Sequence, residues 1–163
     1  QRFRDILRRH ASQARCLASI DIHTGLGPSG VGERIFASFH GEMLGPSRAW
    51  WGELTSVETG SSTSVPMKGP IQAALHDECP RARHAGICLE FGTVPLDKMM
   101  LALRGEHWLH RQGPGVPPHL ARDIRLALRH AFYPESADWM EAVWAQGRQA
   151  FQQALDGLRN WPA

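Results

Sequence analysis

The sequence has few cysteines, a single tyrosine and no long apolar run, and these absences exclude several classes of protein. No apolar run approaches the roughly 18 residues of a membrane-spanning helix. The net charge of +2, with 21% charged residues, gives no strong attraction to nucleic acid or to a membrane surface. Cys16, Cys79 and Cys88 form no C-x-x-C pair, which argues against a disulfide scaffold or a thiolate zinc site. We therefore expect a protein with free thiols in a reducing compartment, the cytoplasm, with no nucleic-acid or membrane partner.

The length and composition predict one globular domain spanning residues 1–163. A chain of 163 residues that is 42% hydrophobic can bury a substantial core. Because the sequence starts at Gln1 within an amphipathic helical pattern, we expect it to be the C-terminal portion of a larger domain. The alternation of predicted strands and helices indicates an α/β fold with helices packed on a sheet.

The predicted elements follow from hydrophobic spacing and from Gly and Pro positions. Strands are expected over residues 16–23 and 85–91, with a shorter one over residues 33–39. Glycines predict a turn-rich loop over residues 24–32, and small polar residues predict a mobile loop over residues 55–64. Helices are expected over residues 3–14, 47–52 and 71–78, from Leu96 to Leu103, after Pro117-Pro118, and from about Ser136 to Leu158.

His23 comes where an apolar strand runs into glycines. The carboxyl end of a strand in an open α/β sheet is a common place for ligands, and we place His23 at such an end. The residue is therefore a candidate metal ligand, with a core histidine bonded to backbone as the alternative.

Glu90 interrupts the second apolar strand with a carboxylate. Strand alternation puts it on the same side as Cys88 and Gly92. An ionised carboxylate buried without a partner costs several kcal/mol or has a raised pKa, which suits a general base. The alternative is a structural salt bridge to an arginine.

Two further motifs are weaker evidence of function. Residues 25–30 match G-x-G-x-x-G after a strand, but Pro28 and Gly32 prevent the helix that a dinucleotide site requires. His107 and His110 lie three apart on a predicted helix, and we interpret them as surface histidines. The sequence contains no G-x-S-x-G elbow and no Walker loop, which argues against a serine hydrolase or a nucleoside triphosphatase.

The segments D-I-H-T-G-L-G-P-S-G at residues 21–30 and L-E-F-G-T at residues 89–93 resemble those of a bacterial family labelled a domain of unknown function. That family is similar to the carboxypeptidase A-like zinc metallohydrolases. The resemblance extends through residues 102–104, 106–110 and 131–134, and so covers most of the chain. It implies the C-terminal part of a zinc-carboxypeptidase-like α/β/α sandwich with a mixed sheet.

The resemblance also implies roles for the two strand residues. His23 would be the later histidine ligand of zinc, and Glu90 would activate the zinc-bound water and pass its proton to the leaving amine. The other two ligands of that superfamily form an H-x-x-E pair, which is absent here, so we expect them upstream of Gln1. The superfamily's peptidases carry a tyrosine shortly before the base, whereas Tyr133 comes well after Glu90. Because of this departure, the resemblance also allows an amidohydrolase similar to aspartoacylase and succinylglutamate desuccinylase.

We therefore expect a zinc-dependent hydrolase of amide bonds, acting on a peptide or an acyl amino acid. The full-length enzyme would be active and this fragment alone inactive, with a homo-oligomer as a possible assembly. The alternative is a catalytically inactive module that binds a peptide or acyl amino acid.

Overall fold

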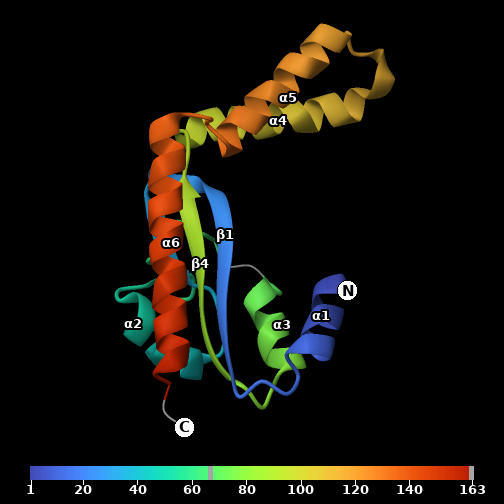
Figure 1. Cartoon of the computed structure of the whole chain (residues 1–163). Helices are drawn as coiled ribbons and strands as arrows, with labels where there is room; N and C mark the ends of the chain where they lie inside the picture. Colours follow the sequence, from blue (N-terminus) through green and yellow to red (C-terminus); the bar gives the residue numbers. More distant parts are fainter. Residues whose placement is uncertain (66–67, 162–163) are drawn as a thin grey trace. The chain divides into compact units, whose positions relative to one another are not determined.

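The computed structural model describes residues 1–65 and 68–161, which form a mixed α/β structure around one sheet (Figure 1). The elements in chain order are α1 (Arg2–His10), β1 (Cys16–Ser29), β2 (Gly32–Phe36), η1 (Gly41–Met43), α2 (Leu44–Trp51), β3 (Thr55–Ser56), α3 (Ile71–Glu78), β4 (Arg83–Gly92), α4 (Leu96–Gln112), η2 (Gly113–Gly115), α5 (Pro118–Phe132) and α6 (Ala137–Arg159). The predicted α/β fold with a mixed sheet is confirmed.

The four strands are ordered β1-β4-β2-β3, so β4 lies between two strands that follow each other in the chain. β4 runs parallel to β1, because Arg83 N–H donates to Arg15 and Thr93 N–H donates to Gly25 further along both strands. β2 pairs in parallel with β3, with Ile35 opposite Thr55. Strand β4 is buried from His84 to its end, as its nearly continuous apolar sequence requires for a central strand.

The connection between β1 and β2 crosses the end of β4 at Gly92. The Gly92 N–H donates to the carbonyl of Val31 at 3.1 Å, and the Gly92 carbonyl accepts from the N–H of Gly30 at 2.9 Å. A Cβ atom at Gly92 would lie 2.1 Å from the carbonyl oxygen of Pro28 and 2.4 Å from Gly27. Only glycine therefore allows the crossing chain to approach β4 this closely.

The contacts divide the chain into two compact units. The first comprises residues 1–22, 33–89 and 145–163. Its α1 and α3 pack through a small apolar cluster of Leu7, Ala74, Leu75, Cys79 and Ala82. Arg4 and Arg8 of α1 both form ion pairs with Glu78 of α3. Elsewhere in this unit the fully buried Trp51 donates its indole N–H to the α6 carbonyl of Ala150 at 2.9 Å.

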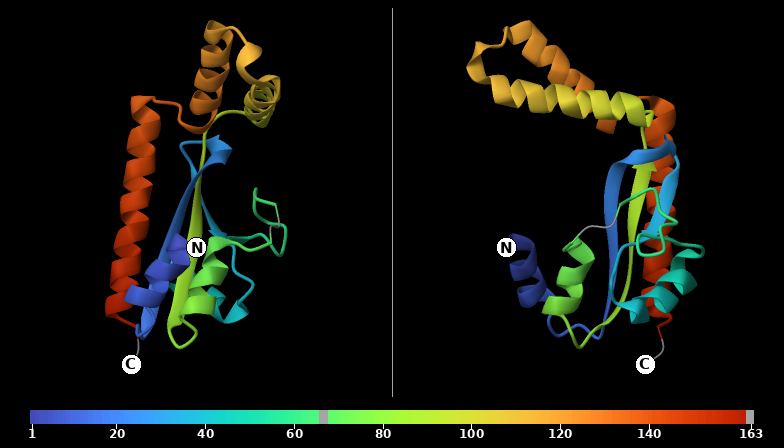
Figure 2. Two further views of the ribbon diagram at one scale, coloured as in Figure 1. Left: turned by 90° about the vertical axis from the view of Figure 1, so that its right-hand side faces the viewer. Right: turned by 180° about the vertical axis from the view of Figure 1, so that it is seen from behind.

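The second unit comprises residues 23–32 and 90–144. Its α4 and α5 lie side by side in Figures 1 and 2, and Pro118 begins α5. The buried Trp139 of α6 donates its indole N–H to Gly92 at 2.8 Å. The same glycine carbonyl at the end of β4 thus also accepts a hydrogen bond from α6.

Most predicted elements are confirmed, and helix 71–78 has the predicted bounds. The loop predicted over residues 24–32 is wrong, because β1 continues through Gly25 and Gly27 to Ser29. Glycine allows this extension because Gly27 has a φ of +104°, a conformation that side chains disfavour. Part of the loop predicted over residues 55–64 is also wrong, since Thr55–Ser56 forms β3.

The apolar spacing predicted the last helix but not which of its faces is buried. Trp144 and Phe151 are 70% and 60% exposed, whereas Trp139, Ala150 and Ala154 are buried. All three cysteines are free, as predicted. None of the helices within residues 1–65 and 68–161 is long and apolar enough to span a membrane.

Replacing Gly92 with alanine should destabilise the fold, because the new methyl group clashes with backbone atoms, which cannot rotate aside as a flexible side chain can. We expect a loss of roughly 1–3 kcal/mol in the free energy of unfolding, measured by urea denaturation. Gly147→Ala is the matched control, since a Cβ at this α6 position meets nothing within 4 Å. The control should be neutral or stabilising by up to about 1 kcal/mol. Equal effects of the two substitutions would contradict the close approach at Gly92.

The Glu33 carboxylate should make stability depend on acidic pH. Partial burial raises the pKa of Glu33, but hydrogen bonds from Thr55, Thr63 and Ser62 lower it, and the net pKa lies below the usual 4.5. The ionised form is therefore favoured by folding, and its contribution is present above about pH 4.5 and lost as the pH falls through the folded-state pKa. Between roughly pH 5 and 3, the wild type should lose more stability than Glu33→Gln. Urea denaturation of both proteins across this pH range measures the difference, and equal losses of stability would contradict this role of Glu33.

Candidate active site

Glu90 is a buried carboxylate near the end of the central strand β4. Its side chain is 8% exposed. The strand is otherwise apolar at this end, with Leu89 and Phe91 on either side both buried. Burial of an ionised carboxylate is costly unless hydrogen bonds or charges compensate it. The groups around Glu90 therefore decide whether the fold favours its ionised or its protonated form.

One of the Glu90 oxygens is held by the backbone of β1. The N–H of Leu26 donates to Glu90 Oε1 at 3.0 Å. The strand can approach this closely because residue 25 is glycine, where a Cβ atom would lie 3.2 Å from the same oxygen. A hydrogen bond to the ionised carboxylate stabilises that form. The sequence did not predict this contact, although a glycine such as Gly25 often indicates a close approach of the backbone.

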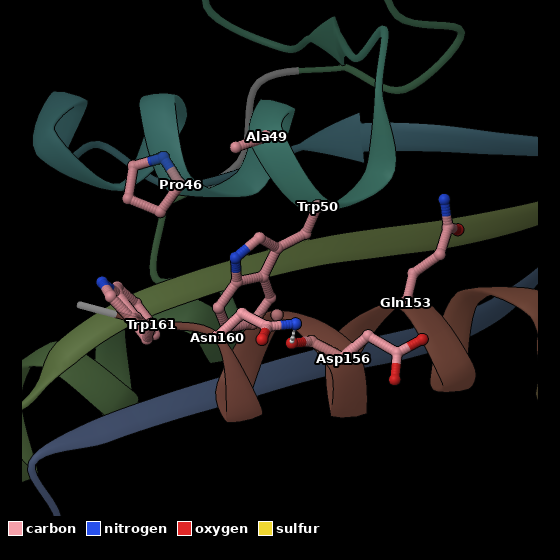
Figure 3. Close-up of a pocket in the computed structure, with 8 residues that line it drawn as sticks. Pro46, Ala49, Trp50, Gln153, Asp156, Asn160 and Trp161 are labelled. Atoms are coloured by element: carbon pink, nitrogen blue, oxygen red, sulfur yellow. Dashed lines mark hydrogen bonds between the residues drawn. The ribbon is translucent and has the colours of Figure 1, made fainter.

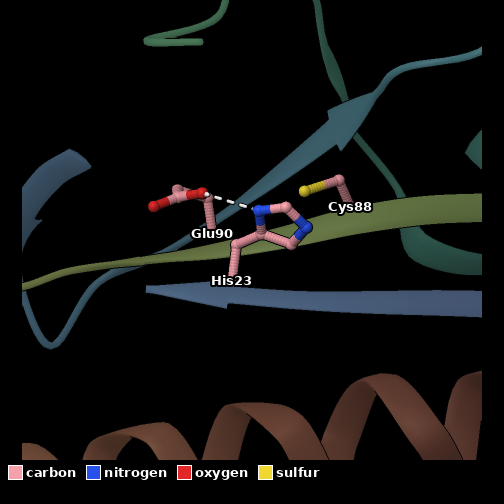
Figure 4. A group of neighbouring side chains, drawn as sticks. All are labelled: His23, Cys88 and Glu90. Carbon is pink, nitrogen blue, oxygen red and sulfur yellow. Dashed lines mark ion pairs between the residues drawn. The ribbon is translucent and has the colours of Figure 1, made fainter. Parts of the chain in front are cut away.

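The other Glu90 oxygen faces His23. The distance from His23 Nδ1 to Glu90 Oε2 is 3.7 Å, shown as the dashed line in Figure 4. The His23 side chain is 46% exposed. The structure thus brings together the two predicted site residues, with the imidazole at the surface and the carboxylate beneath it.

The expected position of His23 at the end of its strand is wrong. β1 continues for six residues beyond it, to Ser29. His23 is therefore preceded and followed by strand residues, so its backbone is more restricted than it would be in a loop. Residues 25–29 of the rejected G-x-G-x-x-G match lie in this same strand, and no helix begins there.

The pair combines chemistry that neither residue has alone. A carboxylate with one oxygen anchored can accept a proton on the other. An imidazole nitrogen can bind zinc or stabilise a negative charge. The ligand atoms of His23, Glu90 and the buried Cys88 lie within 4.8 Å of one another, so these residue types could hold a metal ion or activate a water molecule. These 163 residues contain no H-x-x-E segment.

Thr93 supports the pair from just beyond β4. Its hydroxyl lies 3.0 Å from the Gly25 carbonyl and 2.6 Å from the carbonyl of Ala131, near the end of α5. Its N–H also donates to Gly25. Thr93 thus holds in place the segment of β1 that contacts Glu90. The L-E-F-G-T motif carried this residue, but the sequence did not indicate its partner.

The other predicted residues lie elsewhere. His107 and His110 are exposed on α4, as predicted. Tyr133 packs edge-on against Trp139, with ring centroids 5.7 Å apart, and its hydroxyl lies 3.3 Å from the sulfur of Met140. The tyrosine thus has a packing role.

A separate pocket of about 480 Å³ lies between α2 and the end of α6 (Figure 3). The rings of Trp50 and Trp161 meet edge to face at 4.8 Å in its wall. Asp156 is the only ionisable residue that lines it among the described residues. The pocket could stack an apolar group, but it has no paired acid and base for catalysis.

Comparison with known proteins identifies one family. The profile of a family described as "Protein of unknown function (DUF2817)" matches residues 1–146. No curated protein and no solved structure matches the sequence.

Replacing Thr93 with valine should remove its hydroxyl while keeping its shape. We expect a loss of about 1–3 kcal/mol in the free energy of unfolding, because a buried carbonyl loses its donor. Thr93→Ser keeps the hydroxyl and should retain most of the stability. A valine variant as stable as the wild type would show that the hydroxyl does not support this region.

Proposed function

The chain belongs to the DUF2817 family, and we propose that it carries the base and one zinc ligand of an enzyme that hydrolyses amide bonds. The observation that carries this proposal is the His23–Glu90 pair, with one carboxylate oxygen anchored and the other facing an exposed imidazole at 3.7 Å. The resemblance of residues 21–30 and 89–93 to carboxypeptidase A-like metallohydrolases supports the same assignment.

Each residue has a defined task in this reaction. His23 would hold zinc through its imidazole, and Glu90 Oε2 would take the proton of the attacking water and deliver it to the leaving nitrogen. The Leu26 N–H keeps the carboxylate in place through both proton transfers. Bound zinc supplies a lowered pKa for water and polarisation of the scissile carbonyl. The H-x-x-E pair of ligands that the resemblance implies is absent from these 163 residues.

The substrate class is a peptide with a free C-terminal residue or an N-acyl amino acid. Both present an amide bond next to a carboxylate. The single tyrosine packs on Trp139, so no tyrosine in this sequence is available to act beside the base as in the peptidases. This favours N-acyl amino acids, the substrates of the amidohydrolase side of the resemblance.

Glu90→Gln in the full-length protein should abolish hydrolysis without unfolding it. Glutamine keeps the shape and can still accept a hydrogen bond from Leu26, but it cannot take a proton. We expect a fall in kcat of about 10²–10⁴, the usual contribution of a general base. Substrates to test are N-acetyl amino acids and short peptides, with release of the free amino acid as the readout.

The control is His119→Ala, which changes an exposed histidine of α5 and should retain full activity. Unchanged turnover in Glu90→Gln would contradict the mechanism. No turnover by the wild type, together with saturable binding of the same substrates, would support the inactive binding module instead.

A further inference from the structure

The hairpin of α4 and α5 carries the positive charge of the chain (Figure 2). Residues 96–132 contain six Lys and Arg against three Asp and Glu, a net charge of +3. The rest of the chain contains twelve against thirteen, a net charge of −1. The charge of the whole chain predicted no strong attraction to a membrane surface, but this uneven distribution makes one helical hairpin basic.

Helix α4 carries apolar side chains outside its buried side. Met99 and Leu109 are buried. Met100, Leu103 and Trp108, in contrast, are 49%, 41% and 43% exposed. A surface helix usually has one apolar side, which packs on the core, and polar residues elsewhere. The exposed apolar side chains of α4 are therefore suited to contact a partner.

Cationic side chains lie among these exposed apolar ones. A shallow hollow of about 670 Å³ on α4, which we call the α4 face, is lined by Leu103, Arg104, His107, Trp108 and Arg111. Spacings of three, four and seven residues place them along one side of the helix. All five are exposed, and no acidic residue within residues 1–65 and 68–161 lines the hollow. The α4 face thus fits a partner that offers both negative charge and an apolar layer.

The surface of an anionic bilayer offers both. Tryptophan is enriched at the level of lipid headgroups, and arginine can reach the phosphates while its stem stays in apolar surroundings. A second copy of the chain would bring like charges together at this face. Nucleic acid would neutralise the arginines but offers no apolar layer to Leu103. An acidic segment of another protein is the competing partner.

We propose that the α4 face binds the surface of an anionic phospholipid membrane. Leu103 and Trp108 insert between the headgroups, and Arg104 and Arg111 lie at the level of the lipid phosphates. The helix lies along the surface. The proposal does not depend on the proposed hydrolase, because the His23–Glu90 pair is not part of the α4 face.

Sedimentation of the full-length protein with vesicles tests this binding. The vesicles are phosphatidylcholine, either pure or with one quarter phosphatidylglycerol. We expect binding to the anionic vesicles to be at least about 10-fold stronger and to weaken as salt is raised. Arg104→Gln combined with Arg111→Gln should weaken it about 25-fold, because each cation near an anionic surface contributes a factor of roughly five.

Matched variants separate the α4 face from the charge of the whole protein. Arg2→Gln combined with Arg9→Gln removes the same charge from exposed positions on α1, and its binding should stay within about two-fold of the wild type. Trp108→Ser should weaken binding about 10-fold through the lost apolar contact. Trp144→Ser changes a tryptophan of α6 that is 70% exposed and should bind as the wild type does.

Three results would overturn the proposal. The first is absence of binding or equal binding to neutral and anionic vesicles. The second is equal weakening by the two double arginine variants, which would show that net charge alone is responsible. The third is binding to poly-glutamate without binding to anionic vesicles, which would identify an acidic protein segment as the partner.

Discussion

The close approach of the chain to Gly92 is the contact on which the candidate site depends. Because β4 lies between β1 and β2, the segment that joins these two strands must cross the end of β4. The crossing brings the Gly27 and Pro28 backbone against Gly92, where no side chain fits. Glu90 lies two residues before this contact on one strand, and Leu26 comes just before it on the other. The position of the anchored carboxylate therefore follows from how the backbone passes the end of β4.

Burial makes Glu90 sensitive to the few polar groups that reach it. A carboxylate without compensation at this depth would take up a proton or destabilise the fold by several kcal/mol. The Leu26 N–H compensates one oxygen, and the exposed His23 ring lies near the other. The strand that supplies both groups is held by Thr93, which itself bonds to α5. A small shift of β1 would thus change the electrostatics of Glu90 without moving β4.

The sequence was informative wherever residues close together in the chain decide the local structure. Pro118 and the apolar spacing predicted α5, and the apolar run predicted β4 with Glu90 inside it. Glycines 25 and 27 were misleading because the same backbone freedom serves a turn or a close strand crossing, and only the tertiary structure decides which. The exposed face of α6 was missed because periodicity shows that a helix is amphipathic but not what packs on it.

The two residues of the candidate site differ in exposure in a way that separates their proposed roles. Glu90 is buried, and one of its oxygens accepts a hydrogen bond from the Leu26 N–H, which fixes the orientation of the carboxylate. The His23 side chain is 46% exposed, so its imidazole is open to an ion from solvent. A buried carboxylate held by the backbone suits proton transfer, and an accessible imidazole beside it suits metal binding.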